Sequence, residues 1–178
     1  MASAIENAAG TSFMRHLLNS SGIERFPDAQ YDMVRLGIGL HGIGQTTGLQ
    51  PVSTFKTTIS QIREVRKGET VGYSRRGRLE RDSRIATLPV GYADGFHRNL
   101  GNGTGKIWIE GNVAPVVGDI CMDMTMVDIT GIAASEGDPV EIFGRNMPVS
   151  VLAGLAGTIA YEILTSIPER VKRVYLHD

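Results

Sequence analysis

The feature that most constrains the fold is a series of short apolar segments separated by frequent turn residues. This pattern extends from Val52 to the end of the chain. Lys106–Glu110 alternates between polar and apolar side chains directly before the hairpin signal Gly111–Asn112. Lys67–Thr70 is a further turn signal. Many short strands with turns between them are typical of a small barrel or a sandwich. The sequence therefore predicts a mainly β fold.

The expected strands have apolar or alternating patterns and lie at Phe55–Val65, Ile85–Val90, Lys106–Glu110, Ala114–Ile120, Met124–Ile129, Pro139–Phe143 and Val171–Leu176. Only Val149–Ile167 has a helical pattern, and we expect it to form two short helices that break at Gly157.

The amino-terminal part of the chain has a different pattern. Turn and cap residues at Asn19–Gly22 end a moderately apolar stretch. Met33–Leu40 has the composition of a buried strand but is interrupted by Gly37 and Gly39, and glycine inside a strand often marks close approach of backbone or ligand. Gly42–Pro51 is expected to be a linker.

Composition excludes several classes of protein. A formal net charge of −1 and an aromatic content of 6% argue against a nucleic-acid binder, which usually has a basic surface with stacking rings. The single cysteine excludes an internal disulfide framework and suits a reducing compartment. No apolar run approaches the roughly 20 residues of a membrane span. The start lacks the basic segment and apolar core of a secretory signal, so we expect a soluble, cytoplasmic protein.

Cys121–Met124 invites interpretation as a metal or thiol site. No second cysteine or paired histidine lies at ligand spacing, and the four histidines are scattered, so we predict no metal site. The backbone amides of this segment, or the Asp123 carboxylate, are better candidates for contact with a ligand. The sequence also lacks a dinucleotide or P-loop glycine fingerprint.

Two tyrosines next to turns are candidate site residues. Tyr73 can serve as an acid or base, although a tyrosine near a turn is most often structural. The five arginines between residues 75 and 84 are interleaved with acidic residues, which is typical of a solvated hairpin. The glycines of Gly91–Gly95 hold Tyr92 and Asp94 at a strand end. The residues alone leave open whether this is a ligand site or an Asx-type turn with its own hydrogen bonds.

A third candidate lies near the amino terminus. Ser20 places a hydroxyl at a helix start, and free backbone N–H groups follow the strand that contains Arg35. Such an arrangement is a ready anion site. In isolation, a residue such as Ser20 is more often a helix cap, and one such as Arg35 more often a surface charge.

From about His16 to the carboxy terminus, the order and spacing of these motifs resemble alanine racemase. The matching residues are His16, Asn19–Ser20, Arg25–Pro27, Met33–Arg35, Gly37–Ile38, Val71–Tyr73, Gly91–Gly95, Ala114–Pro115, Val117–Gly118, Cys121–Asp123 and Tyr161–Glu162. The resemblance implies an amino-terminal (β/α)8 barrel that holds pyridoxal 5′-phosphate (PLP), followed by a β domain. Residues 1–44 would be the last part of that barrel, 45–51 a linker and 52–178 the β domain of barrel or sandwich type with short helices.

The resemblance also implies roles for residues at the cofactor. Ser20, Gly37 and Ile38 would bind the phosphate, and Tyr161 would close the same end. Arg35 would face the pyridine nitrogen, and because a guanidinium cannot readily take a proton, the ring would stay unprotonated there.

At the substrate, the resemblance implies interconversion of L- and D-alanine by two bases on opposite faces of the α-carbon, which supplies D-alanine for cell-wall peptidoglycan. Tyr73 would be the base on the L-alanine face and would act across the interface of a homodimer. The backbone of Met122 would contact the substrate carboxylate. Tyr92 would form the inner gate of the substrate channel and favour small substrates.

This chain departs from the family pattern at the second base, the Schiff-base lysine. All four lysines lie in the expected β domain, at Lys56, Lys67, Lys106 and Lys172. We therefore expect the chain to be a carboxy-terminal piece that is inactive alone. Smaller departures are Ser74 and His41, where glycine and tyrosine are more usual, and Asp119, where arginine is common.

Two other functions remain open. One is a non-catalytic β-barrel binding module. The other is a PLP racemase for another small amino acid, or a related PLP-barrel decarboxylase, although Gly91–Gly95 and Cys121–Asp123 favour racemase.

Overall fold

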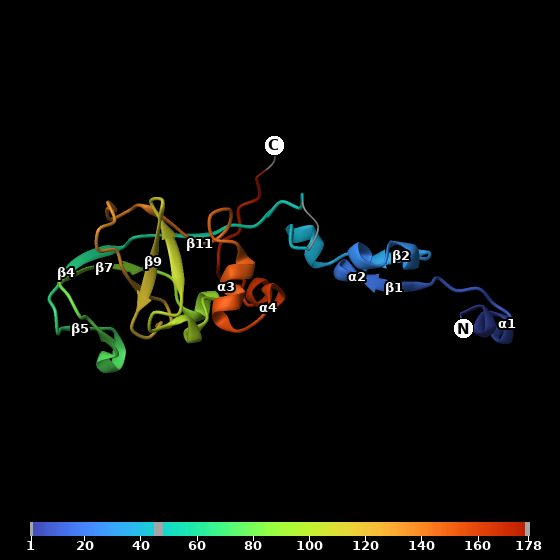
Figure 1. Cartoon of the computed structure of the whole chain (residues 1–178), viewed down its shortest axis with the longest axis horizontal. Helices are drawn as coiled ribbons and strands as arrows, with labels where there is room; N and C mark the ends of the chain where they lie inside the picture. The colour runs from blue at the N-terminus through green and yellow to red at the C-terminus, as the bar shows by residue number, and fades with distance from the viewer. Residues whose placement is uncertain (1, 45–47, 177–178) are drawn as a thin grey trace. The chain divides into compact units, whose positions relative to one another are not determined.

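The computed structural model describes residues 2–44 and 48–176 and divides at Ser53 and Thr54 into two compact units. Residues 45–47 of the expected linker lie outside the described residues. Both units are drawn in Figure 1.

The first unit contains a parallel pair of strands with a helix between them. Its elements are α1 (Ala2–Ala9), β1 (His16–Asn19), α2 (Ser20–Arg25), the 3-10 helix η1 (Pro27–Ala29), β2 (Met33–Arg35) and the 3-10 helix η2 (Ile38–His41). The two strands pair in parallel. The Asn19 side chain caps α2 by accepting a hydrogen bond from the Gly22 amide at 3.0 Å. A β-α-β sequence of parallel strands is the repeating unit of α/β folds.

The strand expected over Met33–Leu40 is shorter than predicted, because β2 ends at Arg35 and η2 begins at Ile38. Gly37 has φ −125° and ψ −97°, which is not a strand conformation. A Cβ on Gly39 would lie 2.8 Å from the Leu36 side chain. The glycines thus turn the chain tightly after β2.

The second unit is built on an antiparallel sheet. Within residues 54–176 the sheet has seven strands in the order β3-β11-β8-β9-β10-β7-β4. They are β3 (Phe55–Thr58), β4 (Gln61–Val65), β7 (Ser83–Leu88), β8 (Lys106–Ile109), β9 (Asn112–Val117), β10 (Thr125–Asp128) and β11 (Pro139–Phe143). The small hairpin of β5 (Thr70–Val71) and β6 (Gly77–Arg78) is separate.

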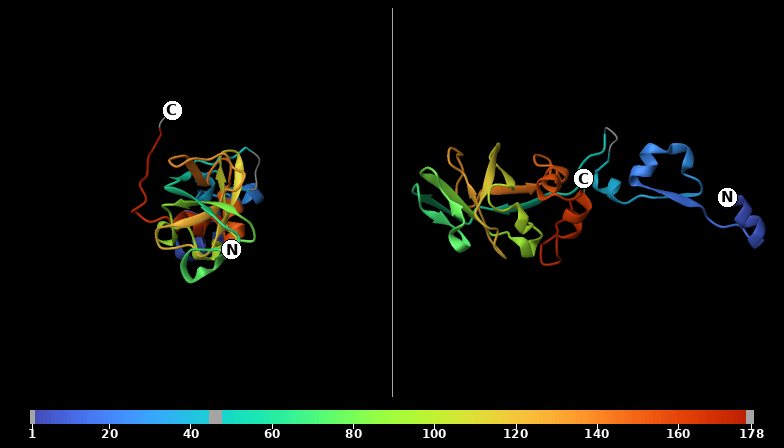
Figure 2. Two further views of the ribbon diagram at one scale, coloured as in Figure 1. Left: turned by 90° about the vertical axis from the view of Figure 1, so that its left-hand side faces the viewer. Right: turned by 60° about the horizontal axis from the view of Figure 1, so that its bottom comes forward.

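The sheet is curled into a half-barrel. β3 and β4 are its opposite edges, yet only Ile59 and Ser60 separate them in sequence. The Ile59 amide donates to Asp138 O at 3.0 Å beside β11, and the Ser60 amide donates to Thr87 O at 2.9 Å on β7. A flat sheet could not bring its two edges to one dipeptide, and the curled sheet is visible in Figures 1 and 2. Phe55–Val65, predicted as one strand, is therefore two.

Side chains that alternate along the strands fill the inside of the curl. Ile107, Ile109, Ala114 and Val127 are completely buried. The predicted hairpin after Lys106–Glu110 is confirmed, with its two-residue turn at Glu110 (φ 45°) and Gly111 (φ 77°). Positive φ at both positions is typical of the turn that matches the twist of paired strands.

The helical prediction for Val149–Ile167 is confirmed as α3 (Val149–Ala156) and α4 (Ala160–Thr165). Gly157 ends α3 with φ 71°, and its amide donates to Ala153 O and Gly154 O. The predicted strand Val171–Leu176 is wrong: no strand of the described residues pairs with it, so its apolar pattern is left without a sheet.

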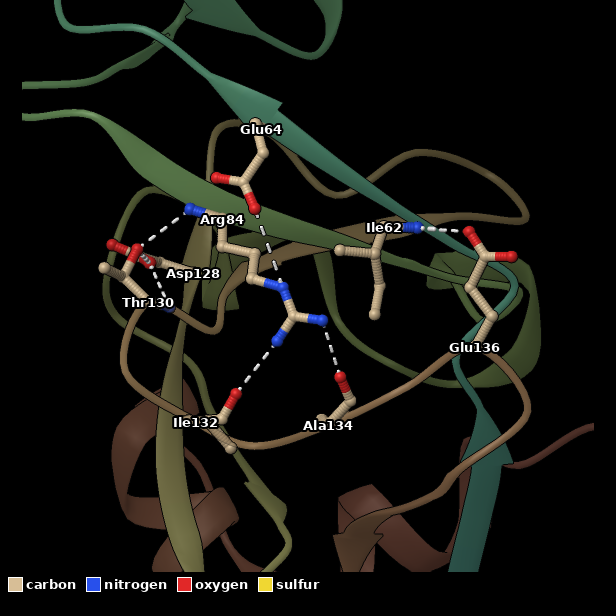
Figure 3. A network of polar contacts seen from close by, with 8 residues as sticks. All are labelled: Ile62, Glu64, Arg84, Asp128, Thr130, Ile132, Ala134 and Glu136. Atoms are coloured by element: carbon tan, nitrogen blue, oxygen red, sulfur yellow. Dashed lines mark hydrogen bonds and ion pairs between the residues drawn. The ribbon is translucent and has the colours of Figure 1, made fainter.

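A polar network fastens the loop that leads into β11 (Figure 3). The guanidinium of Arg84, on β7, donates to Ile132 O at 3.0 Å and Ala134 O at 2.8 Å. Further along the loop, the Glu136 carboxylate accepts from the Ile62 amide on β4 at 2.9 Å. These bonds hold the loop against the edge where the sheet closes.

Among residues 2–44 and 48–176, no helix is long and apolar enough to cross a membrane.

Candidate functional site

The first unit forms a small group of donors around Ser20. This residue begins α2 directly after β1 and is 6% exposed. Its Oγ accepts hydrogen bonds from the amides of Gly37 at 2.9 Å and Gly39 at 3.3 Å. Because a hydroxyl has two acceptor positions and one proton, these bonds leave the proton to be donated. No acceptor among the described residues takes it.

Gly37 and Ile38 come together with Ser20, as the sequence predicts for these three residues. The Ile38 side chain is 7% exposed and anchors η2. A Cβ on Gly37 would have only the Ser20 Oγ near it, at 3.9 Å, so space remains around the turn. A hydroxyl proton beside backbone amides is a donor set that suits an anion such as phosphate.

Arg35 is held by the neighbouring strand of the same unit. Its Nη1 lies 3.0 Å from His16 Nδ1 and 3.4 Å from His16 O. β1 and β2 pair in parallel with His16 opposite Met33 and Asn19 opposite Arg35, so the Arg35 side chain reaches back along β1 to His16. His16 was part of the sequence motif, but its position as the partner of Arg35 depends on the pairing of the strands.

Tyr73 is at the tip of the β5–β6 hairpin, in the 3-10 helix η3 (Tyr73–Arg75), and is 72% exposed. Gly72 before it has φ 77°, and Ser74 and Arg75 after it have φ 56° and 55°. The left-handed region is costly for residues other than glycine. The turn is therefore strained, and the phenol stands in solvent.

Tyr92 begins the 3-10 helix η4 (Tyr92–Asp94), which follows β7. The Asp94 carboxylate accepts from the Gly91 amide at 2.9 Å, three residues back, so the local bond is that of a capping box at the start of η4 and differs from an Asx turn. The same turn also joins the second motif, since the Tyr92 and Ala93 amides donate to the carbonyls of Cys121 and Met122, each at 3.0 Å.

Gly91 is required for this junction. A Cβ there would lie 2.3 Å from the carbonyl oxygens of both Cys121 and Met122. The structure thus brings Tyr92 and Met122 together, and both are about half exposed, at 42% and 54%.

Arg170 clamps the same two segments and was missed by the sequence reasoning. Its Nε donates to Asp94 Oδ1 at 2.8 Å, and its Nη2 donates to Asp123 Oδ1 at 2.5 Å. The hydrogen bonds with Asp94 and then Asp123 raise the pKa of the Arg170 guanidinium. A lone arginine far along the chain gives no signal for such a contact.

Tyr161 lies on α4 and is 44% exposed. The end of α4 contacts the Tyr92 turn, because Ser166 Oγ donates to Gly95 O at 3.4 Å. Its predicted role at the phosphate stays a prediction.

Thiol and metal chemistry have little support at this site. Burial raises the pKa of the Cys121 thiol, and the Asp119 carboxylate raises it further, so the thiol stays protonated and is a poor nucleophile. Among the residues that the structure describes, no group of three or more histidine, cysteine or acidic side chains is placed to hold a metal.

Comparison with known proteins gives a consistent result. The family model of the alanine racemase C-terminal domain matches residues 52–175. Alanine racemase 1 of Clostridium acetobutylicum is 41% identical over 177 residues, which covers 93% of this chain and 46% of the relative. The structure of alanine racemase from D-cycloserine-producing Streptomyces lavendulae matches with a TM-score of 0.92 at 32% identity, over 98% of this chain and 49% of that one. Alanine racemase from Bartonella henselae with covalently bound pyridoxal phosphate matches with a TM-score of 0.88 at 34% identity, over 98% and 51%. The chain spans about half the length of the relatives that it matches.

Proposed function

The chain belongs to the family of alanine racemase C-terminal domains, and on that premise we propose that it forms part of an enzyme that interconverts L- and D-alanine with PLP. The observation that carries the proposal is the junction of the Gly91–Gly95 turn with Cys121 and Met122. It places Tyr92 beside the half-exposed Met122. We further propose that the enzyme is cytoplasmic and supplies D-alanine for peptidoglycan.

The first unit would hold the phosphate end of the cofactor. The Ser20 proton and the Ile38 amide would bind phosphate oxygens, the Gly37 amide would join them by turning away from Ser20 Oγ, and Tyr161 would close this end. Arg35, oriented by His16, would face the pyridine nitrogen as a permanent donor. The β1-α2-β2 arrangement supports our proposal that residues 1–44 belong to a (β/α)8 barrel, with 45–51 as linker and 52–178 as the β domain.

The fit to PLP is partial. When bound, PLP withdraws electrons from the amino acid and makes its α-proton easier to remove. The residues described above supply contacts for its phosphate and ring nitrogen, but all four lysines lie after Ser53. We therefore propose that the 178-residue chain is inactive when assayed alone.

The second unit would act on the amino acid. Tyr73 would hold or remove the proton on the L face, and its 72% exposure at a hairpin tip supports reaching into the site of the other subunit of a homodimer. The Met122 backbone would bind the substrate carboxylate. Tyr92, fixed beside it, would narrow the channel to alanine-sized substrates.

The experiment joins the amino-terminal half of the Clostridium acetobutylicum racemase to this chain and measures conversion of L- to D-alanine with PLP. We expect activity in the hybrid, none in the 178-residue chain, and a loss of about 10²- to 10⁴-fold in Tyr73→Phe, as for removal of a catalytic base. Tyr175→Phe, which removes a hydroxyl from a tyrosine that is 78% exposed, is the matched control. A correctly folded hybrid that binds PLP without racemising alanine would overturn the proposal.

Subunit mixing tests whether Tyr73 acts across the interface. Hybrid Tyr73→Phe is mixed with a hybrid that lacks the cofactor lysine of its amino-terminal half. A mixed dimer then has one complete site, and random exchange restores about one quarter of the activity. No recovery from a mixture shown to contain mixed dimers places Tyr73 in the site of its own subunit.

A further inference from the structure

A buried carboxylate lies between the segments that carry the candidate tyrosines. The Asp119 side chain is 9% exposed and accepts hydrogen bonds from Arg98 Nη2 at 2.9 Å and Asn102 Nδ2 at 2.7 Å. Arg76 Nε lies 3.7 Å from the same carboxylate. Burial of a carboxylate is costly unless donors compensate for the lost water, and three side chains do so here.

The donors come from both tyrosine-bearing regions. Arg76 directly follows η3, and its amide donates to Tyr73 O at 3.4 Å. Arg98 begins the 3-10 helix η5 (Arg98–Leu100), the next element after the Tyr92 turn. The Asp119 carboxylate therefore connects the two regions through side chains.

The backbone reinforces this connection at the Tyr73 hairpin. A Cβ on Gly77 would lie 2.8 Å from Val71 O and 3.0 Å from Gly118 N, and one on Gly118 would lie 2.9 Å from Val71 O. The hairpin thus rests directly on the segment that contains Asp119. Further along that segment, the carbonyl oxygens of Cys121 and Met122 accept hydrogen bonds from amides of the Tyr92 turn. Val117–Met122, the support segment, is a common base for both turns.

We propose that Asp119 is a positioning residue that fixes the Tyr73 hairpin relative to the Tyr92 turn and Met122. The role rests on the proposed function only where it concerns catalysis, since the positional effect can be measured without it. Loss of the carboxylate charge releases Arg76 and Arg98. The hairpin, already strained at Ser74 and Arg75, then loses one of its attachments to the support segment.

Hydrogen exchange on the 178-residue chain tests the positional effect. Asp119→Asn keeps the size of the side chain but removes its charge. We expect amides in residues 71–77 and 91–95 to exchange about tenfold faster, with residues 106–117 unchanged, as for a local opening. Asp128→Asn is the control, because Asp128 is also a shielded carboxylate, paired with Arg81 and 14% exposed. Unchanged exchange in Asp119→Asn, or equal acceleration in all segments, would overturn the proposal.

Isotope effects on the racemase hybrid test the catalytic consequence. We expect Asp119→Asn to lower kcat with little change in KM and to raise the α-deuterium isotope effect more for L-alanine than for D-alanine, since Tyr73 serves the L face. Asp128→Asn should change neither isotope effect. If the hybrid is inactive while exchange responds as expected, the proposed function fails and the positional role stands. If the hybrid is active and Asp119→Asn alters neither exchange nor isotope effects, the positional role fails.

Discussion

The two units contain strands of similar apolar composition but differ in what covers them. In the second unit, inward side chains such as Leu88 and Val127 are completely buried by the curled sheet. In the first unit, Leu17 on β1 is 62% exposed, and Leu36 and Leu40, which follow β2, are 51% and 64% exposed. A two-stranded pair is marginally stable in water, whereas a curled sheet with a filled interior supports itself. Apolar composition therefore gives a core only where the topology closes around it.

The candidate site residues fall in both units. Tyr73, Tyr92 and Met122, at the proposed substrate end, are supported by a well-filled unit. Ser20 and Arg35, at the proposed cofactor end, belong to the thinly covered unit. We expect the geometry of the cofactor end to depend more on additional contacts than that of the substrate end.

The largest expected effect separates the two cores. Leu88→Ala should lower the free energy of unfolding of the second unit by about 2–5 kcal/mol, because a buried cavity replaces the side chain. The single tryptophan, Trp108 on β8, reports this unfolding in urea by its fluorescence. Leu17→Ala should leave hydrogen exchange of β1 and β2 unchanged. Faster exchange in β1 and β2 would show that the Leu17 side chain packs in a core of the first unit.

A second pair of variants compares arginines. Arg84→Met removes the guanidinium that donates hydrogen bonds to Ile132 O and Ala134 O. We expect the free energy of unfolding, measured in urea, to fall by about 1–3 kcal/mol. Arg15→Met breaks an exposed pair with Asp32 in the first unit and should have no measurable effect. Equal losses of stability in the two variants would mean that the exposure of the arginine does not determine how much its contacts stabilise the fold.

A third variant tests backbone strain at the Tyr73 hairpin. Ser74→Gly should stabilise the second unit by up to about 1 kcal/mol, because glycine adopts φ 56° without steric cost. Ser74→Ala keeps the Cβ and is the matched control, expected to give no gain. A gain of equal size in both variants would exclude strain as the cause.

The smallest effect is a pH dependence at Asp128. Partial burial raises the pKa of Asp128, but hydrogen bonds from Thr130 and Arg81 together lower it below its ordinary value. A lowered folded-state pKa gives stability that is complete above the ordinary value of about 3.9 and is lost as pH falls through the folded-state value. Asp128→Asn should therefore lose less stability than wild type between pH 5 and pH 3. The Asp32→Asn control should follow wild type in the second unit.

The sequence was most informative where local chemistry decides the structure. Gly157 ends a helix and Lys106–Glu110 leads into a hairpin, both as predicted, because each depends on near neighbours. The prediction at Val171–Leu176 was wrong, since a strand needs a partner that the segment itself does not specify.

The candidate site was predictable to a similar extent. The contact between Ser20 and the Gly37 turn was anticipated from a hydroxyl at a helix start, amides after the next strand and the resemblance to alanine racemase, whereas its role at a phosphate stays a prediction. Arg170 and the partners of Asp119 were not anticipated, because these contacts join residues far apart in the chain. Local sequence does not encode which distant charges meet.

The closure of the sheet has a consequence for synthesis of the chain. Phe55 on β3 pairs with Phe143 on β11, more than eighty residues later, so β3 leaves the ribosome long before its partner exists. At about 5–20 residues per second, the delay is on the order of ten seconds. During this time the first strand is an unpaired edge that carries an exposed aromatic ring. We therefore expect a pause in translation before Pro139 to prolong an aggregation-prone state.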